Sequence, residues 1–315
     1  MEITAKMVKE LRELSGAGMM DCKKALGECN GNMDEAMEYL RKHGQAKAEK
    51  KAGRIAAEGL CRVVRNADDT VAAVVEVNSE TDFVAKNEEF QTFVMNVAEQ
   101  AAETQAPDID AFLAEAWKLD GAKTIKEALV EKIARIGENL NIRRFEKVVA
   151  ADGMVATYVH GGGKIGVIIE AATDVRNDGI KEALTNLAMQ IAAMAPLHVS
   201  TDEISEAYKE KEKEILLSQA MLENEQLEES KRKPQQIIEK MMIGRLAKQL
   251  KEICLLEQVY VKAEDGKQTV GQYVAAVAKA NSANLSIKRF VRFETGEGLQ
   301  KKEEDFAAEV AKQIG

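Results

Sequence analysis

Aromatic residues and proline are scarce in this sequence. Only 4% of its residues are Phe, Trp or Tyr and only 3 are Pro, whereas 31% are charged and 45% are hydrophobic. The low proline content argues against long disordered proline-rich linkers. The high charge, with enough apolar residues for a core, favours a helix-rich protein with a large solvated surface. A length of 315 residues allows two or three domains, at roughly 100–200 residues each.

Cysteine and histidine are also few, and neither forms a metal-binding pattern. The sequence contains Cys22, Cys29, Cys61 and Cys254, and as histidines His43, His160 and His198. No two cysteines have the Cys-x-x-Cys spacing, and no histidine lies at the distance of a zinc finger. Scattered cysteines in a chain of this size fit a reducing compartment. We therefore expect no metal site and no cofactor.

Long hydrophobic runs and an excess of positive charge are absent as well. No stretch reaches the roughly 18 apolar residues of a membrane span, and the N-terminal MEITAKMVKELREL carries charges throughout, unlike a signal peptide. The formal net charge of −9 argues against a dedicated nucleic-acid binder. We expect a cytoplasmic protein with neither a membrane nor a nucleic acid as a direct partner.

The glycine-rich stretch HGGGKIG at 160–166 contains two patterns that are typical of enzymes. Gly161, Gly163 and Gly166 match the dinucleotide fingerprint, but a strand pattern follows at once, whereas that fingerprint must open a helix. His160 and the next glycines resemble an esterase oxyanion loop, yet the chain has no Gly-x-Ser-x-Gly elbow. We interpret the stretch as a hairpin turn, and the sequence predicts no enzyme.

Hydrophobic spacing predicts three short helices in the first fifty residues. Apolar faces occur at 7–11, 20–29 and 36–40, and Gly44 suits the C-cap of the third helix. The basic segment RKHGQAKAEKKAGR at 41–54 follows. We interpret it as a solvated connector; the alternative is an arm that contacts RNA, although it lacks aromatic residues for base stacking.

The middle of the chain contains an internal repeat. The strand pattern VAAVVEV at 71–77 corresponds to GVIIEA at 166–171 with an offset of 94 residues, and NLNIRRF at 139–145 returns as NLSIKRF at 284–290 with an offset of 145. Helical segments at 87–102 and 178–194 follow the strands. We interpret the repeat as two copies of one α/β unit, each with a hairpin, a helix and a closing strand.

The two offsets differ by 51 residues, so the second copy is expected to carry an insertion of about that size. The segment 200–253 fits, because two apolar patterns with helical spacing are separated by Pro234. It predicts an antiparallel helical hairpin, either projecting as an arm or packed flat on the core. The predicted domains are a helical module with its connector at 1–54, a first core copy at 55–149, a second at 150–199 and 254–293, the hairpin at 200–253, and a C-terminal module at 294–315 that Phe306 and Val310 could dock.

The segment NSETDFVAKN at 78–87 is unusual, because it leaves a strand and precedes a helix. Asn87 can cap that helix, and Phe90 begins its buried stripe. Phe83 lies outside the stripe. It either folds back on the helix start as a hydrophobic staple or is presented to another protein as an exposed wedge. The residues alone favour the staple.

Five blocks of this sequence, spread over nearly its whole length, resemble the elongation factor Ts family and occur in the family's order. They are LRELSGAGMMDCKKAL at 11–26, EVNSETDFVAKN at 76–87, IARIGENLNIRRF at 133–145, YVHGGGKIGVII at 158–169 and RFETGEGLQKKEEDFAAEV at 292–310. The resemblance implies an α+β fold with an N-terminal three-helix UBA-like module, a duplicated α/β core, an inserted coiled-coil hairpin and a C-terminal module. It also implies a non-enzymatic guanine-nucleotide exchange factor that binds elongation factor Tu with GDP, displaces Mg²⁺ and promotes GDP release, so that GTP can bind.

The resemblance further implies which residues meet that partner. Thr81, Asp82, Phe83 and Val84 match the family segment that intrudes beside the nucleotide site and displaces Mg²⁺. Phe83 would be the wedge, because an aromatic ring offers a large rigid apolar surface. Asp82 would form hydrogen bonds with the partner and add unfavourable charge near the phosphates. This reverses the preference for a staple.

Weaker correspondences add further contacts with the partner at Met19, Met20, Ile136, Gly137 and His160. For the two methionines the alternative is core packing, and for His160 it is a structural role in the turn. The second functional hypothesis is an RNA-associated protein that uses Lys47, Lys50, Lys51 and Arg54. An enzyme is the third.

Overall fold

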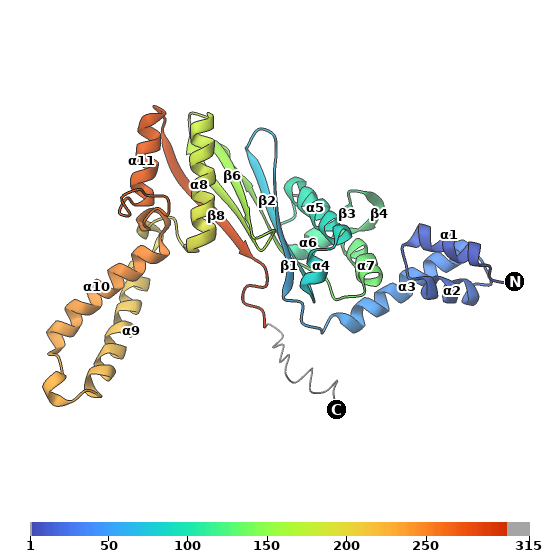
Figure 1. Ribbon diagram of the computed structural model, residues 1–315, viewed down its shortest axis with the longest axis horizontal. Coiled ribbons are helices and arrows are strands. Elements are labelled where there is room, and N and C mark those ends of the chain that lie inside the picture. The colour runs from blue at the N-terminus through green and yellow to red at the C-terminus, as the bar shows by residue number, and fades with distance from the viewer. Residues whose placement is uncertain (1, 301–315) are drawn as a thin grey trace.

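The computed structural model describes residues 2–300 and shows a mixed α+β protein. Within these residues, N-terminal helices are followed by antiparallel sheets and helices, and the expected fold class is confirmed at that level (Figure 1). Residues 301–315, with Phe306 and Val310 and most of the predicted C-terminal module, lie outside the described residues. None of the helices in the described part is both long and apolar enough to cross a membrane.

The N-terminal helices are α1 (Ala5–Ser15), α2 (Met19–Glu28) and α3 (Met33–Lys51), and they pack around Leu11 and Leu26. The expected C-cap at Gly44 is wrong, because α3 continues through Gly44 to its end at Lys51. Gly44 is buried, and a Cβ added to it would lie 3.7 Å from Ala134 in the later helix α7 (Ile125–Ile136). The glycine therefore allows two helices to approach closely; it does not end one.

The first sheet has the strand order β1 (Glu58–Arg65), β2 (Val71–Ser79), β5 (Asn141–Val149), and all its pairs are antiparallel. Helix α5 (Glu88–Glu103) covers one face through the predicted stripe that starts at Phe90, which confirms that stripe. The connection from α5 to β5 contains α6 (Ile109–Ala114), β3 (Ala116–Trp117), β4 (Asp120–Thr124) and α7 (Ile125–Ile136).

The second sheet has the order β6 (Gly153–His160), β7 (Ile165–Thr173), β8 (Leu285–Glu294), again antiparallel. Helices α8 (Asp178–Met194) and α11 (Val270–Ala280) pack on its outer face. An apolar layer that includes Val74 and Ile168 fills the space between the two sheets. Each sheet is therefore buried on both faces, which explains the nearly continuous hydrophobic runs of β2 and β7.

The two sheets correspond residue by residue. The pair Gly59↔Asn78 has its counterpart, 94 residues later, in Gly153↔Ala172, and both central strands carry a register shift after a glutamate, Glu76 or Glu170. These glutamates make matching ion pairs: Arg144 Nε lies 2.6 Å from Glu76, and Arg289 Nε lies 2.9 Å from Glu170. The offset between the two arginines is 145, as in the sequence repeat.

The hairpin of each sheet contacts the first strand of the other. Cys61 N donates to Gly163 O at 2.7 Å, and Val155 N donates to Asp69 O at 2.7 Å, which is the equivalent bond with the sheets exchanged. His160 pairs with Ile165 across the β6–β7 turn, so the predicted hairpin turn is confirmed. The sheets are thus related by an approximate twofold arrangement.

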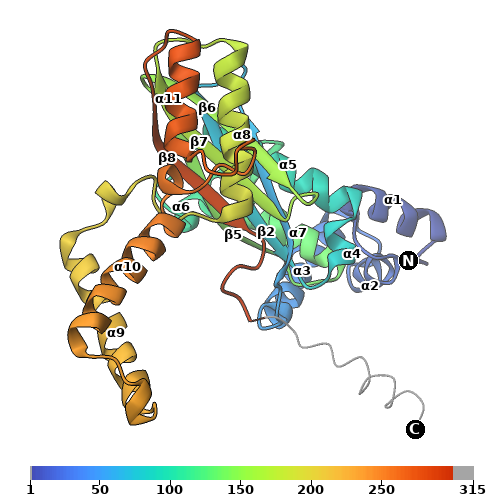
Figure 2. The same cartoon turned by 60° about the vertical axis from the view of Figure 1, so that its left-hand side comes forward.

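Helices α9 (Glu206–Glu225) and α10 (Gln235–Ile253) lie side by side and extend away from the sheets (Figures 1 and 2). Pro234 precedes α10, and a small apolar core at Leu216, Ile238 and Met242 joins the helices. The adjoining 3-10 turns are η1 (Thr201–Glu203), η2 (Glu229–Lys231) and η3 (Leu255–Glu257).

Candidate functional site

A four-residue helix, α4 (Asp82–Ala85), forms the joint between β2 and α5. Phe83 lies on it and is 79% exposed, more than any other large hydrophobic side chain among the described residues. A staple would cover this ring with the first turn of α5, so the staple interpretation is wrong. The ring points away from the protein's own core. The folded protein therefore lacks the roughly 1.5–3 kcal/mol of stabilisation that burial of this side chain would contribute.

Helix α4 depends on its surroundings, because four residues are too few for a helix to be stable alone. Ala85 is buried and Val84 packs on the core beneath α5. Thr81 caps the helix, since its Oγ1 accepts from Val84 N at 3.4 Å. Asn87 then caps α5 by accepting from Glu89 N and Phe90 N, as predicted. Phe83 is therefore held outward by anchored neighbours on both sides.

Asp82 is paired with Lys86, the residue that follows α4. Lys86 Nζ donates to its carboxylate at 2.6 Å, and the same ammonium lies 5.9 Å from the centroid of the Phe83 ring. The hydrogen bond from Lys86 lowers the pKa of Asp82 below its ordinary value, and the positive charge of Lys164 adds to this effect. Asp82 is thus a carboxylate at neutral pH, and its negative charge stands beside the exposed ring.

Ile136 and Gly137 form the turn that ends α7. Gly137 has a φ of +89°, which favours glycine, and its N–H donates to Ile133 O. Its carbonyl accepts from Lys51 Nζ at 2.6 Å, and Ile136 packs on the core beneath α5. The next residue, Glu138, accepts from Thr81 N at 3.0 Å and from Thr81 Oγ1 at 2.7 Å. The structure thus joins this turn directly to the segment that carries Phe83.

A second contact strengthens this junction. Glu80 Oε1 accepts from Asn139 N at 2.6 Å, and the Asn139 side chain donates to Arg54 O at 2.8 Å. Three distant segments, at 51–54, 80–81 and 137–139, therefore meet at the end of β2. Sequence reasoning missed Glu80, Glu138 and Asn139, because their partners lie far away along the chain and no local pattern reveals them.

The hairpin with His160 lies at the same end of the sheets. His160 is exposed, and its Nδ1 lies 3.1 Å from Tyr158 Oη. Lys164, in the same hairpin, contacts Glu58 at the start of β1 at 2.5 Å. Since Lys164 also influences Asp82, the hairpin, α4 and the turn at 136–139 share one end of the molecule.

Met19 and Met20 begin α2 and are exposed, by 54% and 75%. Neither belongs to the core of the N-terminal helices, so core packing as their role is wrong. Figure 1 shows α1 and α2 packed around the N-terminal part of α3, away from α4. The two methionines therefore form a separate exposed apolar site, with Leu14 of α1 also exposed.

The basic connector is largely engaged within the protein. Lys47 Nζ lies 2.6 Å from Asp21, Lys51 Nζ donates to Gly137 O, and Arg54 contacts Glu80. These contacts engage three of the four basic residues on which the RNA hypothesis depends. The hypothesis of an RNA-contacting arm therefore has no support from the geometry.

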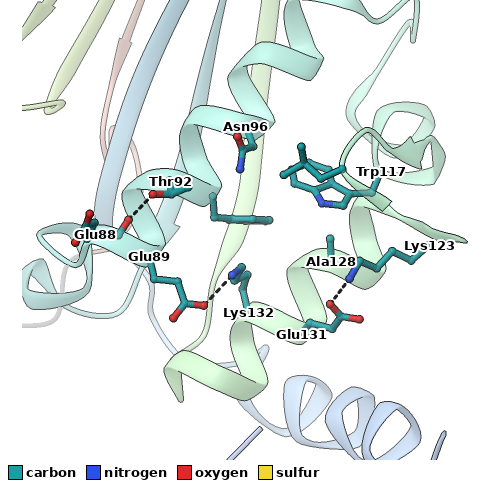
Figure 3. A pocket seen from close by; sticks show the side chains of 11 residues that line it. Glu88, Glu89, Thr92, Asn96, Trp117, Lys123, Ala128, Glu131 and Lys132 are labelled. Atoms are coloured by element: carbon teal, nitrogen blue, oxygen red, sulfur yellow. Dashed lines mark hydrogen bonds and ion pairs between the residues drawn. The ribbon is translucent and has the colours of Figure 1, made fainter. Parts of the chain in front are cut away.

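A cavity of about 480 Å³ lies between α5, the β3–β4 hairpin and α7, with Phe93 and Trp117 in its lining (Figure 3). Four of the charged side chains in its lining are paired: Lys132 contacts Glu89 at 2.7 Å, and Lys123 contacts Glu131 at 2.5 Å. Among residues 2–300, no group of His, Cys, Asp or Glu is arranged to hold a metal ion. The exposed groups around α4 are suited to contact with another protein.

Comparison with known proteins agrees with this geometry. Residues 80–297 match the family model described as "Elongation factor TS". The chain is 54% identical to elongation factor Ts of Clostridioides difficile (strain 630), over 99% of both chains. It is 49% identical to elongation factor Ts of Clostridium botulinum (strain Eklund 17B / Type B), again over 99% of both. A third relative, elongation factor Ts of Clostridium perfringens (strain SM101 / Type A), is 48% identical with the same coverage.

Proposed function

The chain belongs to the elongation factor Ts family, and from that membership we propose that α4 is the element that opens the nucleotide site of elongation factor Tu. The chain is a nucleotide exchange factor for elongation factor Tu in translation elongation, and it is not an enzyme. The sequence predicts a cytoplasmic location, and translation factors of this family act in the cytoplasm. What α4 does to the partner is the proposal.

The single observation that carries the proposal is the exposure of Phe83 on an anchored helix. Large apolar side chains that stay exposed on a fixed support are typical of binding hot spots. Phe83 inserts between packed elements of elongation factor Tu beside the bound GDP and Mg²⁺. Because α4 is held at both ends, little conformational freedom is lost when the ring inserts, and less binding energy is spent on ordering it.

Asp82 supplies the electrostatic part. Its carboxylate arrives beside the phosphates and Mg²⁺, where a further negative charge is unfavourable for the bound nucleotide. The factor and GDP then weaken each other's binding to the partner by the same factor, as linkage requires. Mg²⁺ leaves, GDP follows, and GTP replaces the factor. No bond is made or broken on the factor in this sequence.

Other residues widen the contact. The turn with Ile136 and Gly137 and the hairpin with His160 flank α4 at the same end, so both are proposed to meet elongation factor Tu alongside Phe83. Met19 and Met20 provide a second attachment on the N-terminal helices. Two linked attachments raise the effective concentration of each, so the wedge stays near the nucleotide site while it inserts.

We also propose that the two sheets belong to two copies of one α/β unit, within the domain boundaries expected from the sequence. The matched ion pairs of Glu76 and Glu170 support this. The side chains of Gln100 and Gln190 also match, because each donates to one backbone group and accepts from another in a later segment, at 116–118 for Gln100 and at 259–261 for Gln190. The α9–α10 pair then forms the insertion at 200–253, and the N-terminal helices form the UBA-like module.

The copies differ in length at the joint with α4. The offset between them is 94 residues at Glu80 and Asp174 but 90 at the helix caps Asn87 and Asn177. The first copy is therefore four residues longer at this joint, and α4 has four residues. An element that the second copy lacks is not required by the fold of the unit, which supports a functional role for α4.

Retention of the partner tests the proposal at its base. The immobilised factor should retain a GTPase of the size of elongation factor Tu from a bacterial lysate, and GDP with Mg²⁺ should free it, because factor and nucleotide exclude each other. A retained GTPase that GDP with Mg²⁺ fails to free would show binding without exchange and would remove the proposal.

A further inference from the structure

We propose that Glu138 is a positioning residue, which fixes α4 at the angle from which Phe83 enters the partner. The inference rests on the proposed function of α4 and assigns to the exchange reaction a residue that does not itself have to touch the partner. Glu138 is half-buried, follows Gly137 and lies 57 positions from Thr81 along the chain.

The carboxylate of Glu138 holds both polar groups of Thr81. One oxygen accepts from Thr81 N at 3.0 Å and the other from Thr81 Oγ1 at 2.7 Å. The same hydroxyl oxygen accepts from Val84 N and caps α4. Bonds to a charged acceptor are stronger than neutral ones. The orientation of α4 is therefore determined through Thr81 by a residue at the end of a different helix.

The second sheet provides a natural comparison, because it has the equivalent joint without α4. Its Asp174 accepts from Asn284 N at 2.8 Å, just as Glu80 accepts from Asn139 N. The positions equivalent to Thr81 and Glu138, however, are Val175 and Ala283. Val175 N is satisfied locally by Thr173 Oγ1 at 3.2 Å. The bond from an asparagine N–H to the carboxylate at the end of the central strand thus recurs in both sheets. The contact of the Glu138 carboxylate with Thr81 N and Oγ1, which we call the carboxylate clamp, is found at the joint with α4 and not at the equivalent joint.

The base of the clamp is itself fixed. Gly137 ends α7 in a left-handed conformation, and Lys51 Nζ holds its carbonyl. The clamp also sets the spacing between Phe83 and the Ile136–Gly137 turn, two elements proposed to meet the same partner. If Glu138 is removed, the Thr81 N–H loses its partner and α4 can pivot between Ser79 and Asn87. A wedge free to pivot must be ordered during insertion, at the cost of the exchange rate.

The test measures release of fluorescent GDP from elongation factor Tu over a range of factor concentrations. Glu138→Ala should lower the maximal release rate about tenfold, with a smaller change in the half-saturating concentration. Glu138→Gln keeps an acceptor for Thr81 N and should recover most of the rate. The control is Asp174→Ala, which removes a carboxylate that accepts from a backbone N–H at the joint without α4 and should leave release unchanged.

Combination with Phe83→Ala identifies the route of the effect. If Glu138 acts through the wedge, Glu138→Ala should slow the Phe83→Ala variant further by less than about twofold, because the two changes then remove one function. Thermal unfolding of each variant checks its fold. Should Glu138→Ala fail to fold, Thr81→Val, which removes only the hydroxyl, takes its place and should slow release about fivefold.

Three results would overturn the positioning role. If folded Glu138→Ala releases GDP at the normal maximal rate while Phe83→Ala is slow, the positioning role of Glu138 is refuted and the role of Phe83 as the wedge stands. Full multiplication of the two effects in the double variant shows that Glu138 acts independently of Phe83. A normal rate for Phe83→Ala refutes the proposed function of α4, and the positioning role with it.

Discussion

At the scale of single residues, Glu76 carries a buried charge with several hydrogen-bonding partners. Its side chain is fully buried and is contacted by Arg143 Nη1 at 3.0 Å, Arg144 Nε at 2.6 Å and Gly296 N at 2.8 Å. Burial alone would raise the pKa of Glu76, but the hydrogen bonds from Gly296 and Asn78 and the charge of Arg144 together lower it. Glu76 thereby ties the segment after β8 to the first sheet.

A pH dependence of stability follows from this lowered pKa. The unfolded chain takes up the Glu76 proton near the ordinary value of about 4.3, whereas the folded protein does so only at lower pH. The stabilisation of the folded protein by ionised Glu76 is therefore fully present above about pH 4.3 and is lost as the pH falls through the pKa of Glu76 in the folded protein. Glu76→Gln should lower the free energy of unfolding by about 3 kcal/mol at pH 7, measured with urea. The difference in the free energy of unfolding between this variant and the parent should become smaller in acid. A difference that stays the same as the pH falls would contradict this account.

The roles of some single residues could be predicted from the sequence, and the roles of others could not. Asn87 as a cap and the stripe that begins at Phe90 are confirmed, because both depend on spacing within one helix. The exposure of Phe83 did not follow from spacing, since a staple satisfies the same local pattern. Glu138 was missed for a different reason: its partner Thr81 lies on another element, and only folding brings the two together.

At the scale of elements, the helices missed by periodicity carried another signal. Helices α7 and α11 both begin with a capping box, Thr124 with Glu127 and Thr269 with Gln272, at positions 145 residues apart. A search for Ser/Thr followed three residues later by Glu/Gln would have located both starts. The predicted helix end at Gly44 was wrong, because a glycine also occurs where two helices approach closely. Its neighbour Ala134 lies far away along the chain, so the local sequence gives no sign of that contact.

Deletion of residues 82–85 tests the interpretation of α4 as an addition. The shortened joint would have the length that the second sheet already uses, so the fold should survive, with a loss of about 2 kcal/mol from the buried Ala85 and the half-buried Val84. Release of GDP should fall close to the rate without factor. Circular dichroism on heating and stopped-flow release report the two effects separately. An unfolded deletion variant would show instead that α4 is structural.

At the scale of the whole molecule, the twofold contact between the sheets depends on a glycine. Gly163 has a φ of +109°, and a Cβ on it would lie 2.7 Å from Leu60 Cδ2 and 3.3 Å from Cys61 O. With a larger residue at this position, Leu60 would have to move and the hairpin with His160 would have to shift slightly away from Cys61. The glycine-rich pattern thus has a packing role, and the contact places that hairpin at the end of the molecule where α4 lies.

Gly163→Ala should destabilise the protein by about 3 kcal/mol, because backbone strain and the clash with Leu60 add. Gly162→Ala is the matched control: it also has a positive φ, but nothing lies within 4 Å of its added Cβ. Only strain remains there, worth roughly 1–2 kcal/mol. Urea unfolding of both variants measures the difference, and equal losses would refute the packing role of Gly163.

The central claim is that Phe83 on α4 drives nucleotide exchange, and stopped-flow release of fluorescent GDP from elongation factor Tu tests it most directly. Phe83→Ala removes an exposed ring, so its thermal unfolding should match that of the parent. Leu119→Ala, also exposed but on the β3–β4 hairpin, serves as the control. At saturating factor, Phe83→Ala should release GDP at least about tenfold more slowly than the parent and the control. Release at the parental rate by the folded variant would contradict the claim.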